Sequence, residues 1–178
     1  MRAFVAIEID PTPTAGGPGR APDHLTLEFL GEIDPASVGA LGAALGPVGN
    51  ALGPFELVLE GVGAFPNRER PRVVWVGARD GRAEVTELAR RVAEALRPLG
   101  HPSPREAFEP HLTLFRVRSD RDRRRARELL DGVITAPPPR TVRVDRILLK
   151  ESVLAPEGAV HRTLVEVTLR GAARGTRP

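Results

Sequence analysis

The sequence predicts an α+β protein made of two similar lobes that face each other across a groove. Three observations lead to this fold class. Stretches with the two-residue alternation of strands are interspersed with stretches that have helical spacing. The tetrapeptide His-Leu-Thr-Leu occurs twice, beginning at His24 and at His111, 87 residues apart. No linker-like segment divides the 178 residues, so we expect one domain over residues 1–178.

Seven segments have the apolar pattern of strands. In residues 55–62, for example, Phe55, Leu57 and Leu59 share one face. Residues 10–23, between the first two strands, are dense in proline and glycine, which predicts an irregular connection. The expected strands cover residues 3–9, 24–30, 55–62, 72–77, 111–115, 141–149 and 163–169.

Three segments have the spacing of helices. The first begins at Asp34, a typical N-cap residue that is followed by proline, and carries an apolar stripe. The second, at 81–97, has apolar residues at helical intervals and ends before Gly100. The third, near 120–131, begins after Ser119 and has carboxylates in its first turn, where they favour a helix.

Composition excludes several classes of protein. The chain has no cysteine, so disulfides and thiolate metal sites are excluded. No apolar run approaches the roughly 18 residues of a membrane span, and the N-terminus has the pattern of a strand rather than a signal peptide. We therefore expect a cytoplasmic protein. Lys150 is the only lysine among 26 basic residues; arginine suits phosphate, but arginine richness alone is weak support for an RNA partner.

Each His-Leu-Thr-Leu copy can present an imidazole beside a hydroxyl. Residues i and i+2 of a strand share a face, so His24 and Thr26 point one way, as do His111 and Thr113, while the leucines point to the core. If the lobes face each other, the two imidazoles converge. One can then act as a base and the other as an acid, with the hydroxyls donating to phosphate oxygens. Opening a cyclic phosphodiester requires such a pair.

The histidines have two other interpretations. Structural histidines are common in strands, but two of them would not be expected to share their next three residues. A metal site would need three or four ligands, and each copy offers one candidate per face. Glu28 and Glu109 could add to such a site, but nothing in the pattern requires it. We therefore expect chemistry without a metal or another cofactor.

The two motifs resemble those of a known family. His-x-Thr-x-x-Phe followed by His-x-Thr-x-x-Arg is similar to the paired signature of the two-histidine (2H) phosphoesterases, and in particular of the bacterial and archaeal RNA 2',3'-cyclic phosphodiesterases, long called 2'-5' RNA ligases. The similarity extends over most of the chain, in segments 1–9, 61–67, 71–77 and 151–164. It implies a bilobal α+β fold, a pseudo-two-fold pair of antiparallel sheets with outer helices and a central cleft.

The resemblance also implies roles for the motif residues. His24 would be the general acid that protonates ribose O3', and His111 the general base that activates water, leaving a 2'-phosphate. The two roles could be exchanged, in which case the product would be a 3'-phosphate. The substrate-binding residues would hold phosphate oxygens or, for the aromatic ring, stack on the terminal base; they are Thr26, Thr113, Arg116 and Phe29.

Simple alternation conflicts with two of these roles. It places Phe29 and Arg116 on the faces opposite their histidines. The implied roles therefore require each strand to end, twist or bulge near residues 28 and 115. This requirement is a structural prediction in its own right.

The chain departs from the family pattern in three places. The family usually has a helix before the first motif, where this chain has only residues 10–23. His161 replaces a usual tyrosine, and we expect a structural or rim residue there; His101 is expected in an ordinary loop. Residues 116–127 contain seven arginines, a pattern that fits either an RNA-tracking surface or a solvated helix face.

The leading hypothesis is a metal-independent enzyme that hydrolyses RNA 2',3'-cyclic phosphate ends to 2'-phosphates, with minor reversible 2'-5' ligation. The alternatives are a cyclic phosphodiesterase acting on small nucleotides or on ADP-ribose cyclic phosphate, and a non-catalytic nucleotide- or RNA-binding module. The expected partner is RNA with a 2',3'-cyclic phosphate terminus. Neither a membrane nor a protein partner is expected, and the chain is expected to be a monomer.

Overall fold

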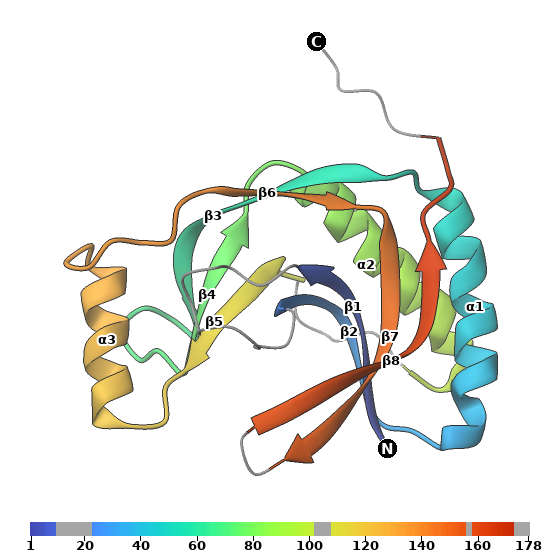
Figure 1. Cartoon of the computed structure of the whole chain (residues 1–178), viewed down its shortest axis with the longest axis horizontal. Helices are drawn as coiled ribbons and strands as arrows, with labels where there is room; N and C mark the ends of the chain where they lie inside the picture. The colour runs from blue at the N-terminus through green and yellow to red at the C-terminus, as the bar shows by residue number, and fades with distance from the viewer. Residues whose placement is uncertain (10–22, 102–107, 156–157, 173–178) are drawn as a thin grey trace.

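The computed structural model describes residues 1–9, 23–101, 108–155 and 158–172 (Figure 1). Its strands are β1 Arg2–Ile9, β2 Asp23–Glu32, β3 Phe55–Phe65, β4 Val73–Ala78, β5 His111–Arg116, β6 Arg140–Val144, β7 Arg146–Ala155 and β8 Gly158–Thr168. Its helices are α1 Val38–Ala51, α2 Arg82–Leu96 and α3 Asp120–Leu130, with the short 3-10 helices η1 Pro35–Ser37 and η2 Arg97–Leu99. The predicted irregular segment 10–23 lies almost wholly outside the described residues.

The described strands form two four-stranded antiparallel sheets. Sheet A has the order β2-β1-β7-β8, and sheet B has the order β5-β4-β3-β6. The two His-Leu-Thr-Leu strands, β2 and β5, are each an edge strand of their sheet, and they contact each other. The predicted pair of antiparallel sheets is therefore confirmed, and the two motifs meet where the sheets adjoin.

The two sheets are not consecutive halves of the sequence. Sheet A combines strands from both ends of the chain, whereas sheet B is built from its middle. The prediction of one strand over 141–149 was wrong, because the chain changes sheets at Asp145: β6 pairs with β3, and β7 pairs with β1. Only two polar residues, Asp145 and Arg146, interrupt the apolar pattern at this bend, so the local pattern does not reveal the change of partner.

The hydrophobic core lies between the sheets and their helices. Odd-numbered residues of β1, such as Val5 and Ile7, point into a cluster that also includes Leu45 of α1 and Leu88 of α2. A second cluster joins Val74 of sheet B to Ala126 and Leu129 of α3. The helices thus cover one face of each sheet, and the motif residues lie on the other face. No helix in the described residues is long and apolar enough to cross a membrane.

Candidate active site

A bulge in β2 brings the sixth residue of the first motif to the histidine face. The register against β1 slips by one between Thr26 and Glu28, so Leu27 has no partner in the ladder. An extra residue reverses the alternation that follows it. Phe29 therefore lies on the same face as His24 and Thr26, while Glu28 turns to the opposite face.

The second motif has a bulge at the same position. In β5 the register against β4 slips between Thr113 and Phe115, and Leu114 is the extra residue. Arg116 consequently shares a face with His111 and Thr113. The break near residues 28 and 115, which the implied roles of Phe29 and Arg116 required, is confirmed. It has the same form in both strands, with the fourth motif residue unpaired.

His24 stands in an aromatic and partly charged environment. Its ring lies 4.9 Å from the ring of Phe4 and 4.7 Å, edge to face, from that of His161. Burial lowers the pKa of His24 to about 4, helped by the positive charges of His161 and Lys150 and opposed by Glu8. The imidazole of the free protein is therefore neutral at pH 7.

His111 has a defined tautomer. Its Nδ1 lies 2.7 Å from the carbonyl oxygen of Glu109, and because a carbonyl can only accept, Nδ1 carries the proton. In the neutral ring Nε2 is then the free acceptor, as a general base requires. The strands that carry the two histidines contact each other, and a charge on His111 lowers the pKa of His24.

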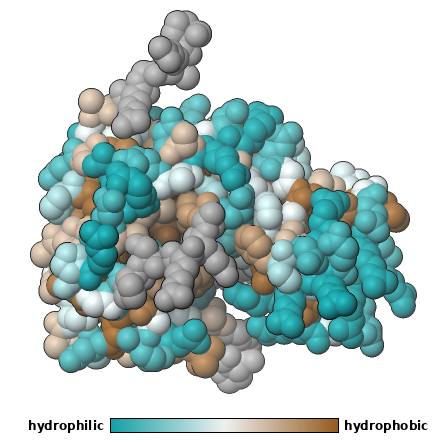
Figure 2. All heavy atoms as spheres, turned by 180° about the vertical axis from the view of Figure 1, so that it is seen from behind, coloured by the Kyte–Doolittle hydropathy of each residue, from teal (hydrophilic) through white to brown (hydrophobic). Residues whose placement is uncertain are grey.

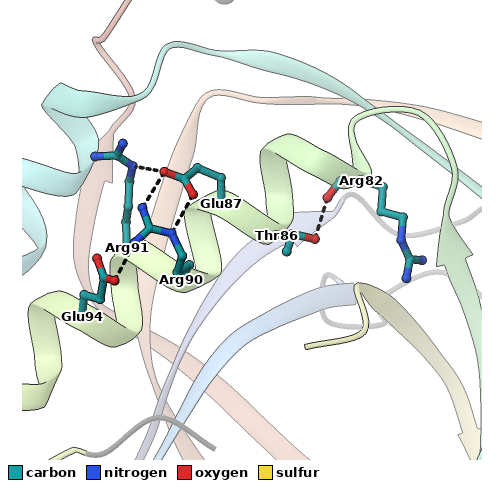
Figure 3. A network of polar contacts seen from close by, with 6 residues as sticks. All are labelled: Arg82, Thr86, Glu87, Arg90, Arg91 and Glu94. Carbon is teal, nitrogen blue, oxygen red and sulfur yellow. Dashed lines mark hydrogen bonds and ion pairs between the residues drawn. The ribbon is translucent and has the colours of Figure 1, made fainter. Parts of the chain in front are cut away.

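The residue that orients His111 is itself held by α2. Arg82 binds both carboxylate oxygens of Glu109, at 2.6 and 2.7 Å, from the first turn of the helix. In Figure 3, Arg82 points away from the other charged side chains of α2, where Arg90 pairs with Glu87 and Glu94. An arginine outside the motifs therefore supports the carbonyl that fixes the tautomer of His111.

The predicted binding residues differ in exposure. Thr26 and Thr113 are half-buried, while Arg116 is exposed and makes no ion pair with any described residue. Phe29 is 68% exposed, which rules out core packing as its role. An exposed aromatic ring beside a histidine and a threonine is available for stacking on a base.

The carboxylates considered for a metal site do not join the histidines. The bulge turns Glu28 to the face opposite His24, and the carboxylate of Glu109 is bound by Arg82. In the part of the chain that the structure describes, no three His, Cys, Asp or Glu residues are grouped to hold a metal ion.

Comparison with known proteins places the chain in a family. Residues 13–152 match the family model described as the 2'-5' RNA ligase superfamily. The chain belongs to this superfamily. It is 33% identical to an RNA 2',3'-cyclic phosphodiesterase of Aeropyrum pernix over 85% of this chain and 84% of that protein. A protein of the same name from Archaeoglobus fulgidus is 33% identical over 92% of this chain and 98% of its own length.

Two solved structures have a similar fold. The TT0787 protein of Thermus thermophilus aligns with a TM-score of 0.73 at 27% identity, covering 96% of this chain and 99% of that one. Escherichia coli LigT complexed with 3'-AMP aligns with a TM-score of 0.69 at 27% identity, covering 94% and 97% of the two chains.

His161 belongs to the surroundings of His24. It was expected as a structural or rim residue, and its ring contacts those of His24 and Phe4. His161 lies on β8 and His24 on β2, the two outer strands of sheet A, so the sheet must curl strongly to bring their rings together. Its Nδ1 is buried without a hydrogen-bond partner among the described residues. The signal at this position was the difference from the tyrosine that the resemblance implies.

Aromatic residues outside the motifs also surround His111. The Phe65 ring lies 4.8 Å from the imidazole, and the Trp75 ring lies 6.0 Å from it. Gly63 makes room for this arrangement, since a Cβ there would stand 2.2 Å from the indole. None of these three residues was assigned to the site from the sequence.

The arginine run divides into two parts. Arg116 lies on the histidine face, but α3 packs on the opposite face of sheet B through Ala126 and Leu129. Within the helix Arg123 pairs with Asp120, and hydrophilic side chains gather over this part of the molecule, at the right of Figure 2. The arrangement favours a solvated helix face for α3 and leaves Arg116 as the arginine available to a phosphate.

Proposed function

We propose that the protein is an RNA 2',3'-cyclic 3'-phosphodiesterase that works by general acid and base catalysis without a metal. The observation that carries this proposal is the pair of contacting strands that bulge at the same motif position and each present a histidine, a threonine and the sixth motif residue on one face. The name shared by the curated relatives supports the substrate.

The proposed reaction uses the two imidazoles in turn. His111 Nε2 takes a proton from water while the water oxygen attacks phosphorus, and Nδ1 stays bonded to the carbonyl of Glu109. The bond between phosphorus and O3' breaks, and His24 gives O3' its proton. A free 3'-hydroxyl and a 2'-phosphate result.

Four side chains would hold the substrate during this step. The hydroxyls of Thr26 and Thr113 donate to the non-bridging oxygens. Arg116 neutralises the charge that develops on them. Phe29 stacks on the terminal base, and its exposure leaves a free ring face for this contact.

The low pKa of His24 constrains the acid role. An imidazole with a pKa of about 4 is neutral at pH 7, so the additional proton that it gives to O3' must be taken up when the substrate binds. The phosphodiester is an anion, and an opposite charge beside an imidazole favours its protonated form. Binding of the substrate therefore prepares His24 as the acid.

The test is hydrolysis of an RNA oligonucleotide that ends in a 2',3'-cyclic phosphate, in buffer containing EDTA. We expect a 2'-phosphate product, and losses of roughly a hundredfold or more for His24→Ala and for His111→Ala. His101→Ala, outside both motifs, is the matched control and should retain full activity. Loss of hydrolysis in EDTA, or catalytic variants within about threefold of the wild type, would contradict the proposal. A 3'-phosphate product would reverse the two histidine roles.

The finer predictions from the sequence are tested by other measurements. Comparing a nucleoside 2',3'-cyclic phosphate with a longer RNA separates RNA ends from small cyclic phosphates as substrates. Joining of an RNA 5'-hydroxyl to the cyclic phosphate measures the minor 2'-5' ligation. The monomeric state, the single domain and the cytoplasmic location stay predictions.

A further inference from the structure

The only lysine of the chain is buried on the histidine face of sheet A. Lys150 pairs with Phe4 across β1 and β7, which places both on the face that carries His24. Its side chain is 6% exposed. A buried cation costs free energy unless it is paired, and the other 25 basic residues of this chain are arginines. A buried ammonium at this place therefore requires an explanation.

The partner of Lys150 leads directly to His24. Its Nζ donates to Oε2 of Glu8, and Glu8 stands opposite His24 in the ladder between β1 and β2. Ala6, a small residue, lies between Phe4 and Glu8 on the same face. The ion pair thus reaches across sheet A from β7 and ends beside the histidine.

Four charged or titratable groups act on His24, each from a different strand. They are Glu8 of β1, Lys150 of β7, His161 of β8 and His111 of β5. Glu8 raises the pKa of His24, and the other three lower it. Lys150 and Glu8 therefore have opposite effects on the same imidazole while neutralising each other.

We propose that Glu8 and Lys150 are positioning residues that set the protonation of His24. Glu8 is the counter-ion of the imidazolium that forms when the substrate binds, and Lys150 holds the Glu8 carboxylate in place and balances its charge before that. A compact ammonium suits this place better than a guanidinium, whose five N–H donors would all need partners in a buried site. The part of this inference that concerns catalysis rests on the proposed function.

The test removes one charge at a time and measures His24 directly. In Lys150→Met the carboxylate acts on His24 unopposed, so the pKa of His24 should rise by roughly half a unit or more. In Glu8→Gln the ammonium acts unopposed, and the pKa should fall by a similar amount. The double variant should return toward the wild type. NMR titration of the imidazole protons, without substrate, gives these values, and the pH profile of kcat/KM should move in the same directions.

Two further variants complete the design. Lys150→Arg keeps the charge and should leave the His24 titration near that of the wild type while lowering stability, because not all guanidinium donors find partners. If Lys150→Met does not fold, Glu8→Gln still tests the proposal. The matched control is the half-exposed pair Arg146 and Glu166, which joins β7 to β8. Glu166→Gln should move neither readout.

The outcomes separate this inference from the proposed function. The inference would be overturned if the pKa of His24 shifted in the same direction in Lys150→Met and Glu8→Gln, or shifted in neither variant, whatever their activity. Opposite shifts with mutual compensation would support it even if no cyclic phosphate were hydrolysed, because the titration contains no substrate. A merely structural ion pair would lower stability in both variants without shifts of opposite sign.

Discussion

Two buried charged residues of this protein are accommodated in different ways. Lys150 is paired with Glu8 and faces the histidines. Glu28 is 5% exposed and, because of the bulge at Leu27, lies beside Val5 on the core side of the sheet. Burial raises the pKa of Glu28 to about 7, so its neutral form is favoured below that pH. The two faces of sheet A thus differ: the histidine face holds a buried charge that is kept, and the core face holds one that burial suppresses.

Replacing Glu28 should change how stability depends on pH. The pKa of Glu28 is about 7 in the folded state and ordinary when unfolded, so the unfolded chain loses the proton first and wild-type stability falls as pH rises from about 4.5 to 7. Glu28→Gln lacks this titration, so its free energy of unfolding relative to that of the wild type should rise by about 1–3 kcal/mol between pH 4 and pH 8. Urea unfolding at the two pH values measures it; a difference independent of pH would contradict the burial argument.

Removing Arg82 should impair catalysis more than binding. Arg82 fixes Glu109, whose carbonyl orients His111, so Arg82→Ala should lower kcat by about three- to thirtyfold through lost alignment of the base, with KM little changed. Arg82→Lys should recover part of the loss. The matched control is Arg90→Ala, on the same helix with pairs that stay within α2. Steady-state kinetics compare the variants, and equal losses for Arg82→Ala and Arg90→Ala would refute the positioning role.

At the scale of single elements, the bulges decide what each motif strand presents. Without the extra leucine, Phe29 and Arg116 would face away from the histidines. The same bulge in both strands gives the two motifs the same geometry, while the sixth residue differs.

Helix α1 contains glycines in two kinds of surroundings. Some of them face open space, and others lie in close contact with sheet A.

Two glycines of α1 should respond to alanine with opposite signs. A Cβ on Gly46 would meet no atom within 4 Å, so Gly46→Ala should stabilise the helix by about 0.5–1 kcal/mol. A Cβ on Gly49 would lie 2.6 Å from the carbonyl oxygen of Thr168, so Gly49→Ala should destabilise by about 1–3 kcal/mol. Urea midpoints test both. Stabilisation by both substitutions would show that β8 does not approach α1 as described.

At the scale of the molecule, the chain order links the two sheets. Sheet A contains β1 and β2 from the beginning of the chain and β7 and β8 from its end, with sheet B between them in sequence. The main hydrophobic cluster includes Ile7 and Leu25 of sheet A together with Leu57 and Val76 of sheet B. Most of the core is this one shared cluster, and only the smaller cluster under α3 belongs to sheet B alone, so the relative position of His24 and His111 depends on the whole fold.

The two sheets should therefore unfold together. Trp75, the only tryptophan, reports on sheet B through its fluorescence, whereas far-UV circular dichroism reports on all elements. Thermal unfolding followed by the two signals should give midpoints that agree within about 1 °C, as a two-state transition requires. Separate midpoints, or two peaks in calorimetry, would mean that the lobes are independent units.

Local pattern determined a large part of this protein. The need for a break near residues 28 and 115 came from the roles that the family resemblance implies for Phe29 and Arg116. The repeated tetrapeptide, the two-residue alternation and the helical spacing predicted the motif strands and helices α2 and α3. These features depend on neighbours within a few residues, where side-chain direction follows from backbone period.

Only the tertiary structure decided the surroundings of the histidines. The change of sheet at Asp145, the contact of His161 with His24 and the pair of Lys150 with Glu8 each join positions far apart in the chain. Periodicity states which face a side chain takes, but not which strand lies beside it or how far a sheet curls. The sequence therefore identified the two histidines as candidates. The curl of sheet A places His161 beside His24, and this curl depends on long-range strand pairing.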